Sequence, residues 1–332
     1  MSDYFNMLND DEDQGSLQEK PDLDTTLQTL QSNVDGAANA TIFYGLSDLN
    51  ADEIGRVQEV WRGLSDEYRP KLLHQLVDVS EANFDLDYRA VGFMALTDES
   101  SLVRAASIDL LWEDESLELM NRLIDIAQWD ESVLVRATAA GALGRFILLG
   151  ELGDLPETET VRAQDVVVNM LSDADEDSEV QRRALEAIAN CSHEIVPEAI
   201  EAAYESDDPR MQASALYAMG RSYDNRWNDT VLREISNPDP AIRFEAVRAS
   251  GELEIDEAVP YLTHMVQGHD REIKEVAIWA LGEIGGNQAM KTLGALADEA
   301  ERDEDVDLIE AIEEAIASAS LAGKDLDFDF DE

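Results

Sequence analysis

Few residues of this chain could do chemistry, and none of them stands in a catalytic pattern. The one cysteine, Cys191, lies two residues before the single His-Glu pair, His193-Glu194. Nucleophilic catalysis would require a base positioned against the thiol, and a histidine two residues away is a weak indication of one. We therefore predict a buried structural thiol at Cys191 and a turn at His193. The sequence has no HExxH, CxxC, Gly-rich phosphate loop or GxSxG motif.

Two acidic runs invite a metal interpretation, and neither meets the requirements of a calcium loop. The run Asp173 to Asp177 lacks glycine at the sixth loop position, and Ala184 stands where a bidentate carboxylate belongs. The carboxyl-terminal run Asp325 to Asp331 fails for the same reasons. We predict solvated turns rather than metal sites, and we expect neither a metal nor another cofactor.

The charge of the chain restricts its partners. A net charge of −50 over 332 residues repels nucleic acid and anionic lipid, and it favours a basic partner. A host with a salt-rich cytoplasm would explain the same acidity, since only five lysines accompany 19 arginines. The single cysteine fits a reducing compartment, and we see neither a signal peptide nor a long apolar run. We therefore expect a cytoplasmic protein with no nucleic acid, membrane or small-molecule substrate.

A recurring phrase determines where the remaining candidates lie. An acidic turn, an aliphatic residue, a basic or amide residue and a small-residue helix ending near glycine recur in turn. The phrase is DESVLVRATAAGALG from Asp130, and it returns from Ser206, Asn237 and Gly268. The same place in the phrase, which we call the key position, is occupied by Gln181, Gln212, Arg243 and Lys274, each 31 residues after the one before. Such a period predicts an all-α stack of helical hairpins with a long surface.

The phrase also divides the chain. Residues 1–35 are acidic and poor in apolar residues, which predicts disorder, and residues 36–84 predict an atypical helical cap. Within this cap, Asn50 is expected to begin a helix that runs to Gly63, and Ser65 to begin another. Residues 85–322 predict the solenoid, with an insertion at about 148–161 that loops out between repeats. The acidic and aromatic tail, 323–332, is predicted to be disordered.

The phrase Asp-x-x-(Val/Ile)-Arg-x-x-Ala-x-x-(Ala/Leu)-Gly resembles the HEAT repeat, in the short prokaryotic form also found in phycobilisome lyase proteins. The resemblance implies an α-solenoid in which acidic turns and basic residues form a ladder, and most such proteins are binding scaffolds. The basic ladder position is matched by Arg104, Arg136, Arg243 and Lys274. Gln181 and Gln212 depart from it, which we expect to weaken the middle of the ladder. HEAT-like deoxyhypusine hydroxylases need several His-Glu pairs for iron, and this chain has one.

The resemblance further implies that the second helix of each hairpin lines a concave face. Residues one, five and nine places after the key position share one side of that helix. Aromatic and arginine residues at these places are the types that anchor protein partners. The predicted stripe consists of Arg145, Arg182, Tyr217, Arg221, Phe244, Arg248 and Trp279. The alternative is that the aromatic residues pack between repeats and the arginines pair with neighbouring acids.

We therefore interpret the chain as a non-catalytic scaffold or adaptor that binds a segment of a partner protein, one with a basic region being favoured by charge, on this concave stripe. The alternative function is a bilin lyase or another chromophore-handling role, which rests on the fold resemblance alone. A weaker idea is that the tail around Phe328 and Phe330 folds back on the stripe as a placeholder.

Overall fold

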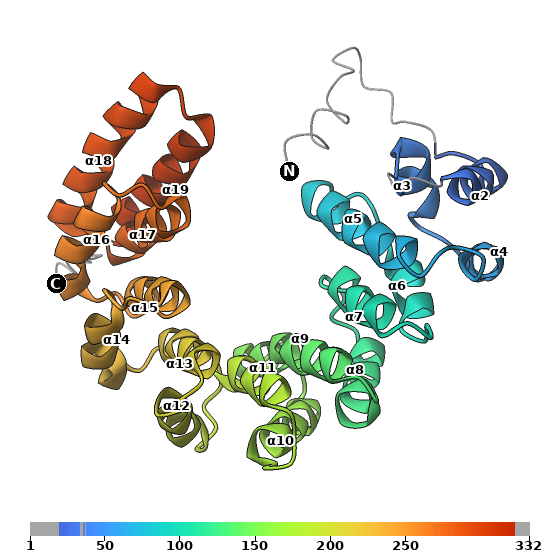
Figure 1. The fold of residues 1–332 in the computed structure, drawn as a ribbon, viewed down its shortest axis with the longest axis horizontal. Coiled ribbons are helices and arrows are strands. Elements are labelled where there is room, and N and C mark those ends of the chain that lie inside the picture. Colours follow the sequence, from blue (N-terminus) through green and yellow to red (C-terminus); the bar gives the residue numbers. More distant parts are fainter. Residues whose placement is uncertain (1–19, 34–35, 37, 323–332) are drawn as a thin grey trace, which may run out of the picture. The chain divides into compact units, whose positions relative to one another are not determined.

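The computed structural model of the protein describes residues 20–33, 36 and 38–322 (Figure 1). Within these residues every regular element is a helix, and no strand occurs. The predicted all-α fold of stacked helical hairpins is therefore confirmed. The chain divides into two compact units, residues 1–146 and 147–332, which we call unit 1 and unit 2. The division falls inside a single helix, close to the place where the sequence phrase loses its register.

Unit 1 packs its helices through large apolar side chains. Its helices are α2 (Leu23–Ser32), α3 (Ala40–Leu46), α4 (Ala51–Trp61), α5 (Tyr68–Ala82), α6 (Arg89–Ala95), α7 (Ser101–Leu110), α8 (Leu117–Trp129) and the first part of α9 (Val133–Leu152). The core of the first six includes fully buried side chains at Leu30, Ile42, Leu46, Leu72, Leu73 and Leu76. These helices do not need a repeated phrase, because bulky side chains fill the space between them.

Of the two helix starts predicted in the cap, one lies where it was expected and the other lies further along the chain. Asn50 caps α4 in a full capping box, in which Glu53 accepts a hydrogen bond from the Asn50 amide. The next helix begins at Tyr68 rather than directly after Ser65. The Ser65 hydroxyl instead accepts a hydrogen bond from the Tyr68 amide, 3.2 Å away, in the turn that precedes the helix.

The predicted disorder of residues 1–35 is wrong for the part that the structure describes. Leu23–Ser32 forms α2, and Asp22 caps it by accepting a hydrogen bond from the Thr25 amide. Leu27 and Leu30, three residues apart, face the core of unit 1 and are buried. An average over the acidic segment hides this apolar pair, which suffices to hold a short helix against a core that already exists. Residues 1–19 and the tail 323–332 lie outside the described residues.

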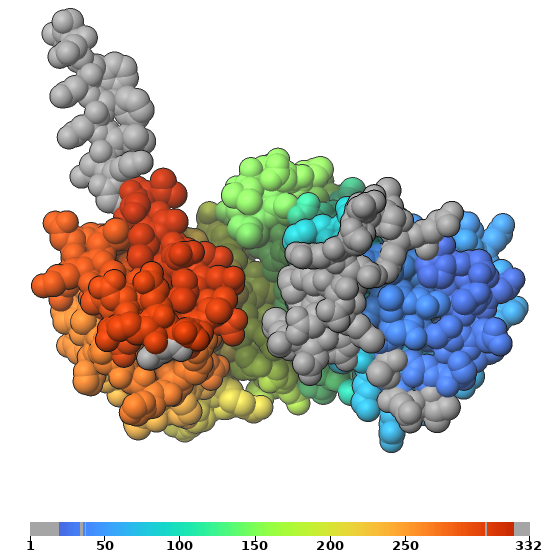
Figure 2. All heavy atoms as spheres, turned by 90° about the horizontal axis from the view of Figure 1, so that it is seen from above, coloured from blue at the N-terminus to red at the C-terminus, as the bar shows by residue number. Residues whose placement is uncertain are grey.

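Unit 2 contains the regular hairpins. First helices are α10 (Glu157–Ser172), α12 (Val196–Tyr204), α14 (Asn228–Glu234), α16 (Val259–Met265) and α18 (Gly286–Asp303). Second helices are α11 (Ser178–Ile188), α13 (Pro209–Arg221), α15 (Pro240–Glu252), α17 (Arg271–Ile284) and α19 (Val306–Ala322). Within unit 2 the second helices form an inner row and the first helices an outer row (Figure 1). At the end of the stack, α18 and α19, coloured red in Figure 2, lie against α16 and α17.

The acidic turns begin the second helices by the expected chemistry. Asp208 and Asp239 each cap a helix whose first residue is proline. The Asp239 carboxylate accepts hydrogen bonds from the amides of Ala241 and Ile242, at 2.9 and 3.3 Å. These caps satisfy amides that the helix itself leaves without partners, so the position of each turn is fixed locally.

Glycine sets the spacing of the inner row. Gly220, Gly251 and Gly282 hold the same place in three successive phrases, and we call them the glycine seam. A Cβ atom at these positions would lie only 2.8–2.9 Å from the Cα atoms of Ala249, Ala280 and Ala315 on the following second helix. No side chain fits in this distance, so consecutive inner helices touch backbone to backbone. Consecutive second helices are accordingly in close contact along the seam.

The predicted insertion at about 148–161 does not loop out. Residues 148–152 continue α9, and α10 begins at Glu157, so only residues 153–156 connect the two helices. Gly153 has a φ of +84°, which accounts for the sharp turn. Gly150 faces the side chain of Thr160, so α10 lies directly against the extended end of α9. The extra residues therefore lengthen one helix. Leucine and glutamate, which predominate in residues 148–152, have high helix propensity.

One described helix, α9, is long and apolar enough to cross a membrane by length and composition. It also carries Arg136, Arg145 and Glu151, and Val135 and Phe146 are fully buried within the protein. These features are those of a core helix.

Candidate functional site

The key position of the phrase closes the acidic turn. A side-chain nitrogen of Arg104, Gln212 and Arg243 donates a hydrogen bond to the carbonyl oxygen six residues earlier. The distances are 2.8–2.9 Å, and Arg136 makes the same bond to the Asp130 carbonyl at 2.9 Å. The turn needs a donor of suitable length rather than a positive charge, and a glutamine amide provides one. The ladder role of Lys274 stays a prediction.

The expectation that glutamine weakens the ladder needs a correction. Gln181 donates to the Asp173 carbonyl, 2.7 Å away, and this carbonyl lies eight residues back because the turn is two residues longer. The local bond is therefore kept at both glutamine positions. What arginine can add is a bond to the next repeat, and Arg104 makes one in unit 1.

Arg104 joins two successive turns of unit 1. Its Nε and Nη2 atoms donate to both carboxylate oxygens of Asp130, each at 2.8 Å. Both side chains are nearly buried, with 11% and 10% of their surface exposed. Burial opposes ionisation of Asp130, but the hydrogen bonds from Arg104 and the Ser132 amide outweigh it and lower the pKa of the carboxyl. Paired charges of this kind are stable together and costly apart.

The predicted stripe of unit 2 lies on the inner row, where α11, α13, α15 and α17 each contribute. We call Arg182, Tyr217, Arg221, Phe244, Arg248 and Trp279 the inner stripe. Tyr217 and Phe244 are half-buried, and Trp279 is 38% exposed. The arginine side chains are 19–34% exposed and all pair with acids of the inner row. The contacts of the arginines are thus those of the alternative interpretation.

Arg182 is held at the first step of the inner stripe. It pairs with Glu179 and with Glu186, whose Oε1 atom is 2.7 Å from the guanidinium. It also donates to the Ser214 hydroxyl on α13 at 3.0 Å, and Ser214 in turn donates to Glu186. The arginine and the serine therefore tie α11 to α13 through one shared carboxylate.

Tyr217 and two arginines form the second step. The guanidinium of Arg248 lies 4.7 Å from the centre of the Tyr217 ring, and that of Arg221 lies 5.9 Å from it. Both arginines also pair with Glu252, at 3.3 and 3.5 Å. The ring and the carboxylate therefore share the two cations, an arrangement that stabilises them through cation–π and ionic attraction together.

Two carboxylates beside this step each have a buried oxygen that makes no hydrogen bond. One oxygen of Glu245 and one of Glu252 have no hydrogen-bond partner, and the side chain of Glu252 is 6% exposed. The free oxygen of Glu252 lies over Gly220, where a Cβ atom would collide with it. Burial raises the pKa of Glu245 to about 7 and also raises the pKa of Glu252, although Arg248 acts against both shifts. Sequence reasoning missed Glu245, which stands two places after the key position, as Ser214 does.

Trp279 differs from the other aromatic residues of the inner stripe. Its ring edge lies 2.9 Å from the place a Cβ atom of Gly251 would take, so the indole covers the glycine seam. Glu275 and Glu283 stand one turn before and one turn after it on the same face of α17. Glu283 accepts a hydrogen bond from Ser318 on α19, and Glu275 pairs with Arg271. Trp279 thus presents an exposed indole between two carboxylates.

Arg145, predicted as a partner-binding residue, serves unit 1 internally. Its guanidinium donates to the carbonyl oxygens of Leu111, Trp112 and Asp114, the last at 2.8 Å. Burial lowers the pKa of Arg145, and Asp114 and Glu115 act against this. Its two terminal nitrogens secure the turn that follows α7, while its buried Nε atom has no hydrogen-bond partner among the described residues.

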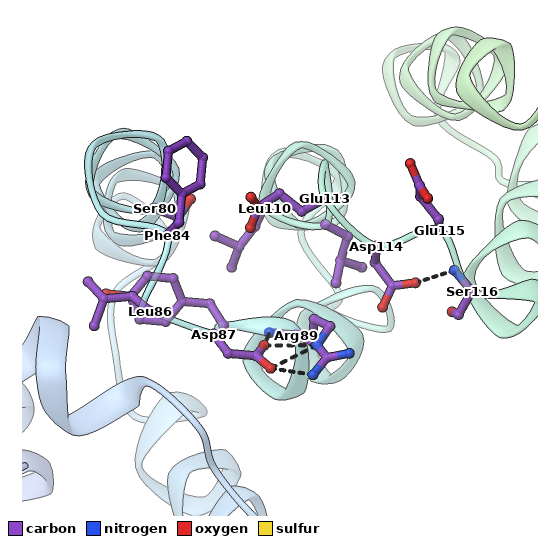
Figure 3. Close-up of a pocket in the computed structure, with 12 residues that line it drawn as sticks. Ser80, Phe84, Leu86, Asp87, Arg89, Leu110, Glu113, Asp114, Glu115 and Ser116 are labelled. Atoms are coloured by element: carbon purple, nitrogen blue, oxygen red, sulfur yellow. Dashed lines mark hydrogen bonds and ion pairs between the residues drawn. The ribbon is translucent and has the colours of Figure 1, made fainter. Parts of the chain in front are cut away.

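A cavity of about 530 Å³ opens in unit 1 beside that turn (Figure 3). It lies between the ends of α5 and α7 and the start of α6. Its lining combines acids with apolar side chains and one arginine, Arg89, which Asp87 binds through both carboxylate oxygens. The side chain of Phe84 beside it is 74% exposed. No sequence pattern indicates this cavity, because its residues come from four segments of the irregular cap and first repeat.

Cys191 and His193, the residues considered for catalysis, have the contacts of structural residues. Cys191 is 8% exposed, and burial raises the pKa of its thiol, as expected of a structural cysteine. His193 lies in the turn before α12, where its Nδ1 atom accepts a hydrogen bond from the Ile195 amide. Among the described residues no group of three or more His, Cys, Asp or Glu side chains could hold a metal ion.

Comparison with known proteins finds several similar solved structures. Solved structures similar to this chain include Escherichia coli YibA, with 17% identity over 93% of this chain and 99% of that one, at a TM-score of 0.42. An engineered protein has 19% identity over 63% and 98%, at 0.39. Human deoxyhypusine hydroxylase with glycerol has 17% identity over 90% and 96%, at 0.34. These TM-scores are too low to support an argument about fold or function. No curated protein is significantly similar to the sequence.

The sequence itself carries the assignment. Residues 228–316 match the family model described as HEAT repeats. The matched segment runs from the start of α14 into α19, and it contains the last two phrases of the 31-residue period. Helical hairpins recur within it, and it contains the turn-closing Arg243 and the seam glycines Gly251 and Gly282. Residues 228–316 of this chain are HEAT repeats.

Proposed function

We propose that the protein is a non-catalytic scaffold and that the inner row of unit 2 binds a partner protein segment carrying basic side chains. The observation that carries the proposal is Trp279, an exposed indole on α17 of a row whose other inner-stripe aromatic residues are half-buried. Aromatic residues with this exposure, next to charged groups, are common anchors of protein interfaces.

Charge favours a basic segment. Glu275 and Glu283 flank the indole, and the chain as a whole carries a net charge of −50. A lysine or arginine of the partner could lie over the indole face and between the two carboxylates, and both contacts would gain as water leaves the interface. The inner arginines are already paired with acids of the protein, so they hold the surface in shape instead of recruiting an acidic partner.

The experiment compares two exposed aromatic residues of unit 2. The chain with Trp279→Ala is used to capture partners from a lysate of the source cells, beside wild type and Tyr261→Ala. Tyr261 is 48% exposed and belongs to α16 of the outer row, so it controls for loss of an aromatic surface residue. We expect partners that wild type and the Tyr261 variant retain equally and that the Trp279 variant loses. Equal recovery by all three would contradict the assignment of the inner row.

A further inference from the structure

The cavity of unit 1 has the composition of a site for a cation. Pocket-lining acids outnumber the single base, since Asp87, Glu113, Asp114 and Glu115 surround it while Arg89 is the one cationic side chain (Figure 3). A neighbouring hollow of about 300 Å³ shares Asp87, Arg89 and Asp114 with it and adds further acids, Asp48 and Glu118. The single cation is already engaged, because Asp87 binds Arg89 with two hydrogen bonds at 2.8 and 3.0 Å from Nε.

Asp114 is the residue that points to a ligand. It is 6% exposed, and it lines both the cavity and the neighbouring hollow. One oxygen, Oδ1, accepts a hydrogen bond from the Ser116 amide at 2.8 Å, and no described residue donates a hydrogen bond to the other, Oδ2. Figure 3 shows this carboxylate beside Ser116, with Leu86 on the opposite side of the view. Oδ2 can therefore accept a hydrogen bond from a group that enters the cavity.

Apolar groups complete the cavity on the side away from Asp114. Phe84 is 74% exposed at the end of α5, and Leu86 and Leu110 line the same wall. An amphipathic lysine or arginine side chain matches such a wall, since its methylene groups cover apolar surface while its charged tip reaches a carboxylate. The excess of acids in the lining favours a cationic ligand over an anionic one.

We propose that this cavity binds a lysine or arginine side chain of a partner segment, with Phe84 contacting its aliphatic part and the neighbouring apolar residue, and Asp114 accepting from its charged tip. The site belongs to unit 1 and does not depend on the inner row of unit 2. It gives the scaffold a second binding point of the same preference for basic segments.

The test measures fluorescence anisotropy of a dye-labelled Leu-Lys-Leu-Lys-Leu peptide with the full chain, beside a neutral Leu-Gln-Leu-Gln-Leu peptide. Asp114→Asn keeps an acceptor for the Ser116 amide and removes the charge. Asp125→Asn, at an exposed position of α8 in the same unit, is the matched control for net charge. We expect about tenfold weaker binding of the lysine peptide by Asp114→Asn, as for loss of one close charge partner, and unchanged binding by Asp125→Asn.

Two further variants act in opposite directions. Phe84→Ala should weaken binding about fivefold through lost apolar contact, whereas Leu102→Ala, at another exposed apolar position of unit 1, should not. Arg89→Gln removes the one cation of the lining and should strengthen binding, which a merely structural role would not produce. Equal effects of Asp114→Asn and Asp125→Asn, equal binding of the neutral peptide, or weaker binding by Arg89→Gln would each overturn the proposal. If Asp114→Asn loses helix by circular dichroism, Phe84→Ala decides, and unchanged affinity there overturns it.

Discussion

Unit 1 and unit 2 solve the same packing problem with different residues. In the first helices of unit 1, leucine, tyrosine and tryptophan side chains fill the space between helices, and Trp61 also donates to Asp98 at 2.8 Å. In unit 2 the inner helices meet backbone to backbone at the glycine seam. Bulky side chains tolerate many arrangements, but a close backbone contact tolerates one residue type. The strict 31-residue phrase therefore appears where glycine sets the spacing.

The key position shows the same contrast. In unit 1, Arg104 closes its own turn and also grips Asp130 of the next turn with two hydrogen bonds. In unit 2, Gln212 and Arg243 both close their own turn by the same carbonyl bond. At Arg104 the positive charge of the key residue therefore links one repeat to the next. What the phrase requires at every key position is only a hydrogen-bond donor that closes the turn.

The largest effect should come from removing the charge at Arg104. Arg104→Gln keeps a donor for the turn and leaves Asp130 buried without its partner, so we expect a loss of about 3 kcal/mol in the free energy of unfolding. Arg243→Gln is the matched change in unit 2, and it should cost no more than about 0.5 kcal/mol because Gln212 already performs the same role. Guanidinium chloride unfolding followed by circular dichroism measures both. Similar costs for the two variants would refute the contrast.

A methyl group in the glycine seam should have the next largest effect. Gly251→Ala places a Cβ atom 2.8 Å from the Ala280 Cα atom and against the Trp279 ring, so α15 and α17 must move apart. We expect a loss of roughly 2 kcal/mol, typical of overpacking in a close contact. Unfolding experiments on the full chain measure it.

The control for the seam is another helical glycine of unit 2. A Cβ atom at Gly294, in α18, would meet no heavy atom within 4 Å. Gly294→Ala should therefore stabilise the protein by up to about 1 kcal/mol, since alanine favours helix. If both alanine variants shifted stability in the same direction, the close contact at the seam would not be what requires glycine.

The sequence predicted the elements that repeat and missed those that do not. The caps at Asp208 and Asp239 and the turn position of the key residues follow from local hydrogen-bond chemistry, which a phrase records. Helix α2 was missed because two leucines three residues apart in an acidic segment acquire meaning only against the core of unit 1. The extension of α9 was missed because helix formers within an interrupted register resemble a loop insertion.

For the inner stripe, the sequence predicted where the residues lie better than it predicted what they contact. Spacing placed Arg182, Tyr217, Arg248 and Trp279 on the inner row, since equivalent residues of stacked hairpins come into line. Whether an arginine is free or paired depends on acids of neighbouring helices. Glu245 was recognised as part of the site only from the structure. The cavity beside Asp114 depends on four segments meeting without any period, so no sequence pattern could indicate it.

The carboxyl group of Glu245, in the inner row of unit 2, makes the stability of the folded protein depend on pH. Glu245 has a pKa of about 7 in the folded protein against an ordinary value of 4.5. The folded protein therefore holds this proton more tightly than the unfolded chain. The resulting stability is fully present below pH 4.5 and is lost as pH rises through 7. Arg248 and Arg182 favour its ionised form, and Glu186 and Glu252 oppose it.

Glu245→Gln should remove this dependence. A neutral amide of the same shape needs no proton, so the variant should gain about 1–2 kcal/mol over wild type at pH 8 and little at pH 4.5. Unfolding free energies measured at pH 4.5, 6, 7 and 8 give the difference curve. Glu272→Gln, at an exposed position of α17, controls for the change in net charge. A difference curve that is flat, or one equal to that of the control, would show that burial does not hold the proton on Glu245.

The smallest effect tests the claim that glycine is required only at the seam. Gly55 lies inside α4 of unit 1, and a Cβ atom there would meet nothing within 4 Å. Gly55→Ala should therefore stabilise unit 1 by about 0.5–1 kcal/mol, because alanine loses less backbone freedom when the helix forms. The measurement is the same denaturant midpoint used for Gly251→Ala, with the opposite sign expected. A destabilised Gly55→Ala protein would mean that α4 meets a neighbour closely, and unit 1 would then use glycine for packing as unit 2 does.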